Sequence, residues 1–312
     1  EGVGEYVVAE DIDGDGYDDL LSSPYVAEPN GVYYSGQGYI HYGPLHESLT
    51  LSEDTADWVL WGYEEDEMSR QTFPVGDLDG DGVTDFAMGS AYADFDGINN
   101  VGKMYIYTTA SSGSEWADDS ALAILGGYDE SDAFGIMVTG GDLTGDGQSE
   151  LLCGAKAANY GEGEVYLFEY ASLSGEMSSL EADETWVGEE HGTTGRGIEL
   201  ADFNNDGTLD MATTGEGSQE GTAYIVWGGP DIAGGYLGDA PVRIRGTNTE
   251  DSSNEFAYRL HASDFNGDGI PDLLVSEGQF DPDDFFLFYG PFGDTALLYD
   301  TDADVKLISD HD

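Results

Sequence analysis

Basic residues are scarce in this chain of 312 residues. It contains 8 Lys and Arg but 65 Asp and Glu, which gives a formal net charge of −57 at pH 7. So few cations cannot form the basic patch that phosphate backbones and anionic lipid headgroups require, and the field of the chain repels both. Nucleic-acid binding is therefore excluded as a function.

Cysteine and long apolar runs are also scarce. Cys153 is the single cysteine, which excludes an internal disulfide and any zinc site built from several cysteines. No apolar run approaches the roughly 18 residues that a membrane-spanning helix needs, so no membrane insertion is expected. Aromatic residues, in contrast, make up 12% of the chain, which is not typical of a solvating acidic tail. The sequence therefore predicts a folded chain with a core.

One nine-residue pattern occurs five times. Its first position is Asp11, Asp77, Asp142, Asp202 and Asp264, so the repeats begin about 63 residues apart. Positions 1, 3, 5 and 9 carry side chains with oxygen atoms, position 6 is always Gly, and an apolar pair follows. Such self-similarity at a fixed period is the signature of a repeat architecture.

Each repeat contains four short runs of β-branched, aromatic and aliphatic residues bounded by Gly, Asp, Asn and Pro, which is typical of strands. Four-stranded units arranged around an axis form a β-propeller. We therefore expect an all-β fold, a single β-propeller domain over 1–312 with four-stranded antiparallel blades. The expected blades are approximately 1–63, 64–128, 129–189, 190–250 and 251–312. Five blades are counted, and five visible blades of a larger ring are the alternative.

The fourth run of each repeat is predicted to form the rim of its blade. Arg243, Arg245 and Lys306 alternate along these runs and are several of the few cations in the chain. Charged residues on an outermost strand hinder pairing between sheet edges.

The repeated loops have the composition of calcium sites. Carboxylates at positions 1, 3 and 5 of one short loop repel each other unless a cation lies between them, and calcium is coordinated by oxygen atoms of this kind. Gly at position 6 allows the chain to turn around the ion. We expect side-chain ligands at positions 1, 3, 5 and 9 and a backbone carbonyl at position 7. The expected ligands are Asp11, Asp13, Asp15, Tyr17 and Asp19; Asp77, Asp79, Asp81, Val83 and Asp85; Asp142, Thr144, Asp146, Gln148 and Glu150; Asp202, Asn204, Asp206, Thr208 and Asp210; and Asp264, Asn266, Asp268, Ile270 and Asp272.

The loops differ from an EF-hand and from one another. An EF-hand requires Glu at position 12. That position is Ser22, Met88, Cys153, Thr213 or Val275. Up to five Ca²⁺ ions are expected, and the Asn side chains of the fourth and fifth loops remain competent oxygen donors. The site at Asp142–Glu150 is expected to be the weakest, because it has Thr144 at position 3 and the longer Glu150 at position 9.

The repeats resemble FG-GAP repeats, the blades of the integrin α-subunit β-propeller and of many bacterial extracellular proteins. The resemblance rests on Phe134-Gly135, on the Asp-x-Asp-x-Asp-Gly-x-x-Asp loop and on the Leu-Leu-x-Gly-Ala strand that starts at Leu151. It covers essentially the whole chain. It implies that the loops bind calcium and join the first and second strands of each blade on one face. The chain departs from integrin propellers in its blade count, because those have seven.

The resemblance implies an adhesion or protein-interaction module. We expect calcium to be structural in it, because a metal that binds only the folded chain stabilises that chain. The alternatives are a carbohydrate-binding propeller, with Tyr33, Tyr34 and Tyr39 as candidates for stacking on sugars, and a structural unit of a surface layer or filament. The partner is expected to be a protein or glycan ligand on a propeller face, with self-association as a further option. No enzymatic activity is expected, because the five His are scattered and no nucleophile or phosphate-binding motif is present.

The expected location is extracellular or at the cell surface. Extracellular calcium sites have dissociation constants of roughly 10⁻⁴–10⁻³ M, and sub-micromolar cytosolic calcium would leave such sites empty. Because the sequence starts at Glu1 without Met and shows no signal peptide, we expect it to be a mature or trimmed product.

Overall fold

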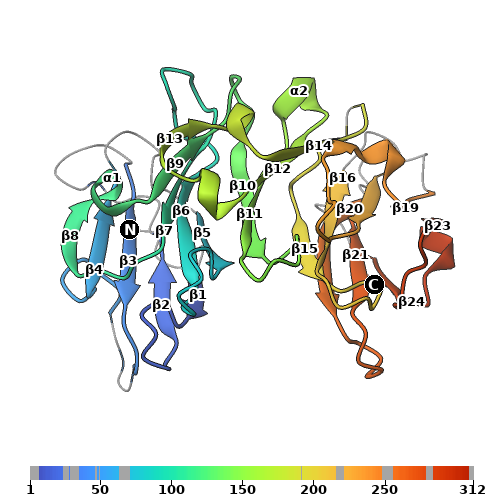
Figure 1. Ribbon diagram of the computed structural model, residues 1–312, viewed down its shortest axis with the longest axis horizontal. Helices are drawn as coiled ribbons and strands as arrows, with labels where there is room; N and C mark the ends of the chain where they lie inside the picture. Colours follow the sequence, from blue (N-terminus) through green and yellow to red (C-terminus); the bar gives the residue numbers. More distant parts are fainter. Residues whose placement is uncertain are drawn as a thin grey trace, which may run out of the picture. The chain divides into compact units, whose positions relative to one another are not determined.

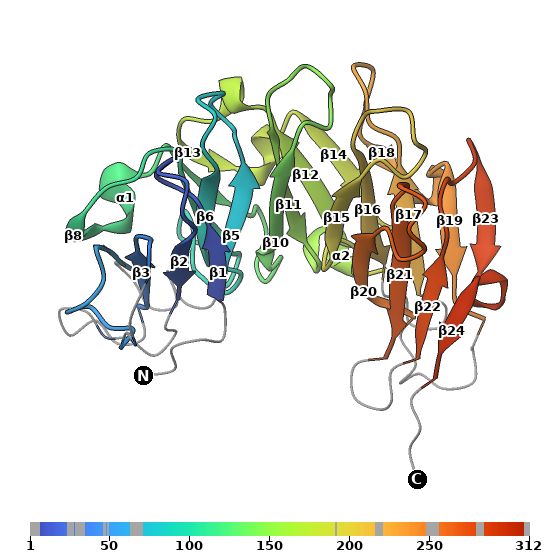
Figure 2. The same cartoon turned by 90° about the horizontal axis from the view of Figure 1, so that it is seen from below.

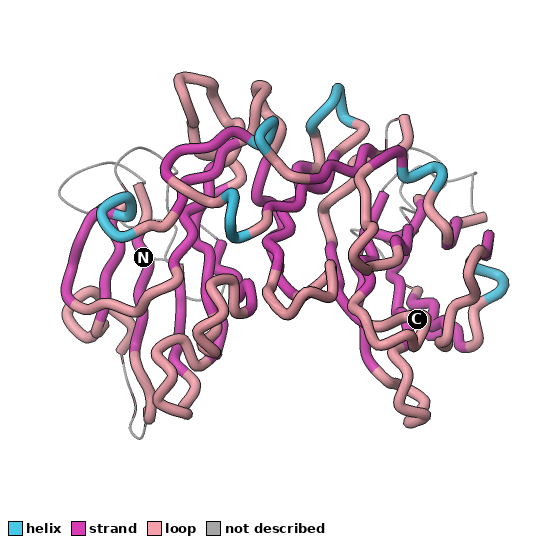
Figure 3. The backbone as a smooth tube through the Cα atoms, viewed as in Figure 1, coloured by secondary structure: helices cyan, strands magenta, loops and turns pink. Residues whose placement is uncertain are grey.

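The computed structural model describes residues 7–23, 28, 35–45, 48, 50–62, 71–190, 192–215, 221–247, 256–278 and 284–308. These residues form five β-sheets joined by loops, and the described helices are turns of three or four residues, as Figures 1 and 3 show. The prediction of an all-β fold with five blades is confirmed. In the described part of the chain, no helix has the length and apolar character that crossing a membrane requires.

Four strands of every sheet come from one repeat and follow its chain order. They are β1 (Val7–Glu10), β2 (Asp19–Ser22), β3 (Gln37–His41) and β4 (Trp58–Trp61); β5 (Gln71–Gly76), β6 (Asp85–Ser90), β7 (Lys103–Tyr107) and β9 (Ala123–Gly126); β10 (Phe134–Gly141), β11 (Glu150–Ala155), β12 (Glu164–Phe168) and β14 (Glu184–Val187); β15 (Ile198–Ala201), β16 (Asp210–Gly215), β17 (Thr222–Val226) and β19 (Val242–Arg245); and β20 (Phe256–Ser263), β21 (Asp272–Glu277), β22 (Phe285–Phe288) and β24 (Val305–Leu307). In the first, second, fourth and fifth sheets these strands pair antiparallel throughout.

Four of the five sheets carry an additional strand that the sequence analysis missed. The additional strands are β8 (Gly113–Trp116), β13 (Gly175–Ser178), β18 (Gly235–Tyr236) and β23 (Ala296–Tyr299). Each belongs to the linker between the third and fourth strands of the following repeat, and it pairs parallel with the fourth strand of the blade before it. The predicted rim is therefore wrong for these blades. Arg243 and Arg245 lie on β19, and β23 covers that strand.

Short helical segments follow these additional strands, and two further helical segments lie elsewhere in the described residues. They are α1 (Ala117–Ser120) after β8, η3 (Ser179–Glu181) after β13, η4 (Leu237–Asp239) after β18 and η5 (Asp300–Asp302) after β23. The remaining segments are α2 (Ala158–Gly161) and η2 (Tyr170–Ser172). Each linker thus crosses to the preceding blade, turns once and returns to its own blade as the fourth strand.

The chain divides into two compact units, each with its own core. One unit is Glu1–Gly141 with Gln148–Leu152 and Phe168–Asp183, and the other is Asp142–Gly147 with Cys153–Leu167 and Glu184–Asp312. That the five blades form a single domain and close into a ring stays a prediction.

Aromatic side chains fill both cores. In the first unit, Phe86 stacks on Tyr107 at a centroid distance of 4.9 Å, and Trp58 meets both rings edge-on. In the second unit, Phe256 meets Phe286 edge-on at 5.4 Å. These contacts explain the high aromatic content, because each large ring buries apolar area between neighbouring strands.

Glycine marks the places where consecutive repeats approach each other. The residue before the third strand is Gly102, Gly163 or Gly221 in the second, third and fourth repeats. A Cβ atom on Gly221 would lie 1.7 Å from the carbonyl oxygen of Phe256, the first residue of the next repeat's first strand. A side chain at this position would therefore push neighbouring blades apart.

We predict that Gly221→Ala destabilises the protein by about 1–3 kcal/mol, because the added methyl group overpacks a backbone contact. Chemical denaturation followed by tyrosine and tryptophan fluorescence measures the change. The matched control is Gly293→Ala, since no atom lies within 4 Å of a Cβ at that position. Equal stability of the two variants would contradict the assigned role of Gly221.

Candidate metal-binding loops

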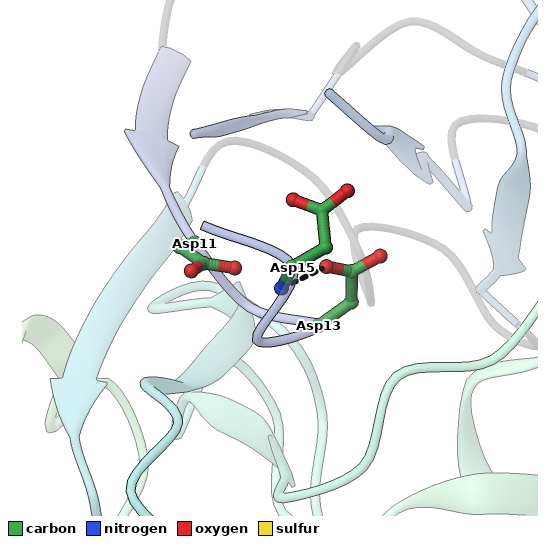
Figure 4. A group of neighbouring side chains, drawn as sticks. All are labelled: Asp11, Asp13 and Asp15. Carbon is green, nitrogen blue, oxygen red and sulfur yellow. Dashed lines mark hydrogen bonds between the residues drawn. The ribbon is translucent and has the colours of Figure 1, made fainter. Parts of the chain in front are cut away.

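The five repeated loops connect the first and second strands of their sheets. They follow β1, β5, β10, β15 and β20, and the acidic residue at position 9 begins β2, β6, β11, β16 and β21. Figure 4 shows the first loop, in which the carboxylates of Asp11, Asp13 and Asp15 project from one tight turn. The sequence pattern therefore corresponds to the same structural element in every repeat.

The carboxylate at position 1 organises each turn. In the first loop, Asp11 accepts hydrogen bonds from the backbone N–H groups of Gly14 and Gly16 at 2.8 and 2.9 Å. Asp77 and Asp264 accept the corresponding bonds in the second and fifth loops. Gly16 has a φ of 89°, and no atom lies within 4 Å of a Cβ there, so backbone conformation alone requires glycine at position 6.

Carboxylate oxygens gather in three of the loops. One oxygen from each of three residues lies within 4.8 Å of the others in the following groups: Asp11, Asp13 and Asp15; Asp77, Asp79 and Asp85; and Asp142, Asp146 and Glu150. These groups contain only oxygen donors, and they sit in turns whose backbone is already fixed by hydrogen bonds. Such a donor set fits a hard divalent cation such as Ca²⁺ better than a soft metal.

In the fourth and fifth loops, the side-chain amide of the Asn at position 3 reduces the repulsion between the carboxylates. The Asn204 side-chain nitrogen donates to Asp206 at 2.9 Å, and its side-chain oxygen accepts from the Asp206 backbone N–H. Asn266 makes the same pair of bonds with Asp268 in the fifth loop. The amide oxygen remains a neutral donor, whereas the amide N–H group offsets part of the charge at position 5.

The carboxylate at position 9 has a structural role that the sequence analysis did not anticipate. Asp19 is buried and accepts hydrogen bonds from the backbone N–H groups of Ile12, at 3.1 Å, and Gly43, at 2.7 Å. Asp210 and Asp272 make the equivalent bonds to position 2 of their loops and to the glycine after the third strand. Position 9 thus ties the loop to the end of the third strand, whether or not it also binds a metal.

Burial shifts the titration of several of these carboxyl groups. Desolvation raises the pKa of Asp85 to about 7 and that of Asp210 to about 6, against the opposing effect of backbone hydrogen bonds. Desolvation also raises the pKa of Asp19. Without a cation, the ionised form of these groups is therefore disfavoured in the folded chain.

Neighbouring loops lie side by side within each unit. A Cβ atom at Gly14 of the first loop would lie 2.9 Å from the Val83 side chain of the second loop. Gly80 of the second loop similarly faces Gln148 of the third loop, and Gly145 of the third loop faces Thr208 of the fourth loop. These contacts place the first loop beside the second, the second beside the third and the third beside the fourth, and we call these four loops the acidic row.

The other candidate side chains do not form a site in the described residues. Tyr39 is buried and donates a hydrogen bond to Gln37, so it packs inside the first sheet. Tyr33 and Tyr34 lie outside the described residues. Cys153 is completely buried on β11, and desolvation raises the pKa of its thiol. A buried strand residue of this kind is chemically inert.

We predict that, in metal-free protein, Asp85 makes the folded state less stable as pH rises from about 4 to about 7. Below the pKa of an unfolded Asp, near 3.9, the group is protonated in both states. Between that value and about 7, the unfolded chain releases the proton first, so the free energy of unfolding falls. Asp85→Asn should weaken this pH dependence, as measured by denaturant titrations in chelator.

The control for this experiment is Asp118→Asn on α1, where the side chain is exposed and the dependence on pH should equal that of the wild type. If Asp85→Asn and the wild type lost stability in parallel over this range, the burial of Asp85 would have no energetic effect.

Three comparisons place the chain among known proteins. Residues 142–213 match the model of an FG-GAP-like repeat, and residues 70–107 and 256–302 match that of an FG-GAP repeat. The chain is 30% identical over 182 residues to integrin alpha-PS2 of Drosophila melanogaster, covering 54% of this chain and 12% of the integrin. It is 27% identical over 223 residues to phosphatidylinositol-glycan-specific phospholipase D of Dictyostelium discoideum, and the match covers 62% of this chain and 23% of the phospholipase.

The fold is also similar to the solved structure of rhamnogalacturonan lyase YesW. The structural match covers 90% of this chain and 48% of the lyase chain, with 14% sequence identity and a TM-score of 0.46. The chain spans less than a quarter of the length of the curated relatives named above. The matches to repeat models cover about half of the chain, and the loop pattern recurs in all five repeats. The predicted resemblance is confirmed, and the chain belongs to the FG-GAP repeat proteins.

Proposed function

We propose that the protein is an extracellular, calcium-binding interaction module in which calcium stabilises the blades and a protein ligand binds a blade face. The observation that carries the calcium proposal is the convergence of three carboxylates in each of three loops. The likeness to integrin α subunits supports the interaction proposal. Both parts go beyond the family assignment, and each has its own test.

The electrostatics of the loops support calcium binding. The chain already carries a charge of −57, so further carboxylates held close together raise the energy of the folded state unless a cation compensates them. The hydrogen bonds from Gly14 and Gly16 to Asp11 fix the turn, so the ordering cost on binding is small. In this proposal, positions 1, 3, 5 and 9 hold Ca²⁺ through side-chain oxygens, and position 7 holds it through its carbonyl.

The expected stabilisation follows from the affinity. At calcium concentrations ten to a hundred times the dissociation constant, each site adds about 1.4–2.7 kcal/mol to the free energy of unfolding. Several such sites together rival the net stability of a domain. Up to five ions are proposed, with the third loop the weakest because it has Thr144 where the other loops have Asp or Asn, and the longer Glu150 at position 9.

We predict that Asp79→Ala removes one bound calcium ion and about 1.4–2.7 kcal/mol of calcium-dependent stability. Asp79 belongs to the carboxylate group of the second loop. Isothermal titration calorimetry gives the number of ions, and melting curves with and without chelator give the stability. Asp118→Ala removes the same charge from exposed α1 and should change neither quantity. A melting temperature that chelator leaves unchanged at low salt would refute the calcium proposal.

The proposed location follows from calcium supply. Loop sites of this type with dissociation constants of roughly 10⁻⁴–10⁻³ M fill only where calcium is millimolar, as outside cells. The absence of enzymatic activity stays a prediction.

The alternatives for the partner remain a glycan and a structural role in a surface layer or filament. The burial of Tyr39 weakens the sugar-stacking proposal at that residue. A cavity of about 220 Å³ in the first unit is lined mainly by charged residues, among them Asp94, Lys103 and Glu176, and also by Phe95. Such a lining does not favour sugar stacking, which needs exposed aromatic faces.

We predict that the protein binds a protein ligand in a matrix-protein and glycan array run in millimolar calcium, and that chelator abolishes the signal. Because calcium orders the loops in this proposal, the binding face should be lost with the ions. A calcium-dependent signal confined to one class of glycan would replace the protein-ligand proposal with the carbohydrate alternative. Silence on the array with folded, calcium-loaded protein would contradict both.

A further inference from the structure

The fifth repeated loop contains a pair of residues that the other four loops do not have. It joins β20 to β21, which lie side by side in Figure 2, and its third and fourth positions are Asn266 and Gly267. At these positions the fourth loop has Asn204 and Asn205, and the remaining loops have Asp or Thr followed by Gly. The side chain of Asn266 and the backbone of Gly267 are exposed to solvent.

An Asn followed by Gly is the pair from which a side-chain amide is lost most readily. The backbone nitrogen of the second residue, after losing its proton to solvent base, attacks the side-chain carbonyl carbon of Asn. A cyclic succinimide forms as ammonia leaves, and water then opens the ring at either of its carbonyl groups to give Asp or isoaspartate. Glycine favours the attack because it has no Cβ to crowd the nitrogen.

The fifth loop holds the reacting groups of this pair together. The side-chain oxygen of Asn266 accepts a hydrogen bond from the backbone N–H of Asp268 at 2.8 Å, and its side-chain nitrogen donates to the Asp268 carboxylate at 2.9 Å. The ring closed by the first bond contains both the carbonyl carbon of Asn266 and the nitrogen of Gly267. Beyond the chain neighbours, no atom lies within 4 Å of a Cβ built at Gly267, so surrounding segments leave room for the succinimide.

One contact opposes the reaction. The backbone N–H of Gly267 donates to the carboxylate of Asp264 at 2.7 Å. The attacking nitrogen has to give up this proton, and the negative charge beside it makes the loss harder. The rate of attack therefore depends on how firmly Asp264 holds the Gly267 N–H.

We propose that Asn266 is a site of spontaneous deamidation, and that the hydrogen bond from Gly267 to Asp264 sets its rate. The reaction replaces the side-chain NH₂ group with OH, consumes water and releases ammonia, and no group is oxidised or reduced. Solvent base takes the Gly267 proton, so no catalytic residue is needed. The composition of the fifth loop therefore changes with time after synthesis.

Both products alter the fifth loop. The Asp product gives it carboxylates at positions 1, 3, 5 and 9, as in the first and second loops, and removes the N–H group donated to Asp268. Isoaspartate inserts a methylene group into the backbone before Gly267, which displaces the N–H groups that Asp264 binds. The effect of either product on calcium affinity rests on the proposed function, whereas the reaction itself does not.

Peptide mapping by mass spectrometry measures the conversion in the folded chain during incubation in mildly alkaline buffer. Asn204 is the internal comparison, because its side chain makes the same bonds to the residue two positions later. Conversion at Asn266 should be about tenfold faster or more, which corresponds to about 1.4 kcal/mol of activation free energy. The same order is expected in calcium and in chelator, so the outcome does not depend on calcium binding. Equal conversion at the two residues, or none at Asn266, overturns the proposal.

Exchanging the following residue between the two loops tests the mechanism. Gly267→Asn reproduces the pair of the fourth loop, where Asn205 also has a left-handed backbone, with a φ of 61° against 81° at Gly267. This variant should slow conversion at Asn266 about tenfold, and Asn205→Gly should speed up conversion at Asn204 by a similar factor. Circular dichroism confirms that both variants fold. Unchanged rates in both would show that the following nitrogen is not the attacking group.

Asp264→Ala tests the restraint, because it removes the acceptor of the Gly267 N–H. In the folded chain it should speed up conversion at Asn266 relative to the wild type. In urea-unfolded chains, where the hydrogen bond does not exist, the variant and the wild type should convert at the same rate. Equal rates in the folded chains would overturn the role assigned to Asp264.

Discussion

The first four blades of this protein each depend on the next repeat to complete their sheet. The parallel strand that pairs with β4, β9, β14 or β19 belongs to the linker of the following repeat. The residue before the third strand is Gly102, Gly163 or Gly221 where the backbone of the next repeat approaches closely. Stability is therefore shared between neighbours, as in repeat proteins whose energy is a sum of repeat and interface contributions. No repeat with this connectivity completes its fourth-strand edge by itself.

The carboxylate loops add a second kind of coupling. Position 9 is buried and hydrogen-bonded to two backbone segments, so the same residue that is proposed to bind a cation also ties the loop to the third strand. Desolvation of Asp85 means that the loop favours either a proton or a metal at this position. The acidic row is thus a structural element whose stability depends on the composition of the solution.

Much of this arrangement was predictable from the sequence. The period of the Asp loops gave the number of sheets, and the β-branched and aromatic runs gave the strands of each repeat. The additional strands were missed because β8, with the sequence Gly-Ser-Glu-Trp, and the two-residue β18 have no apolar alternation. Their pairing depends on the neighbouring blade and not on local propensity. The second role of Asp19 was missed for a similar reason, since its partner Gly43 is distant in sequence.

The additional strand, which comes from the following repeat, also has a consequence during protein synthesis. A ribosome releases the chain from its amino end, so when β4 emerges, its partner β8 is still roughly one repeat away from leaving the exit tunnel. At every stage the most recently made blade presents an uncovered edge, and only the arrival of the next linker protects it. Translation speed through the linkers therefore sets how long that edge is open to mispairing with other nascent chains.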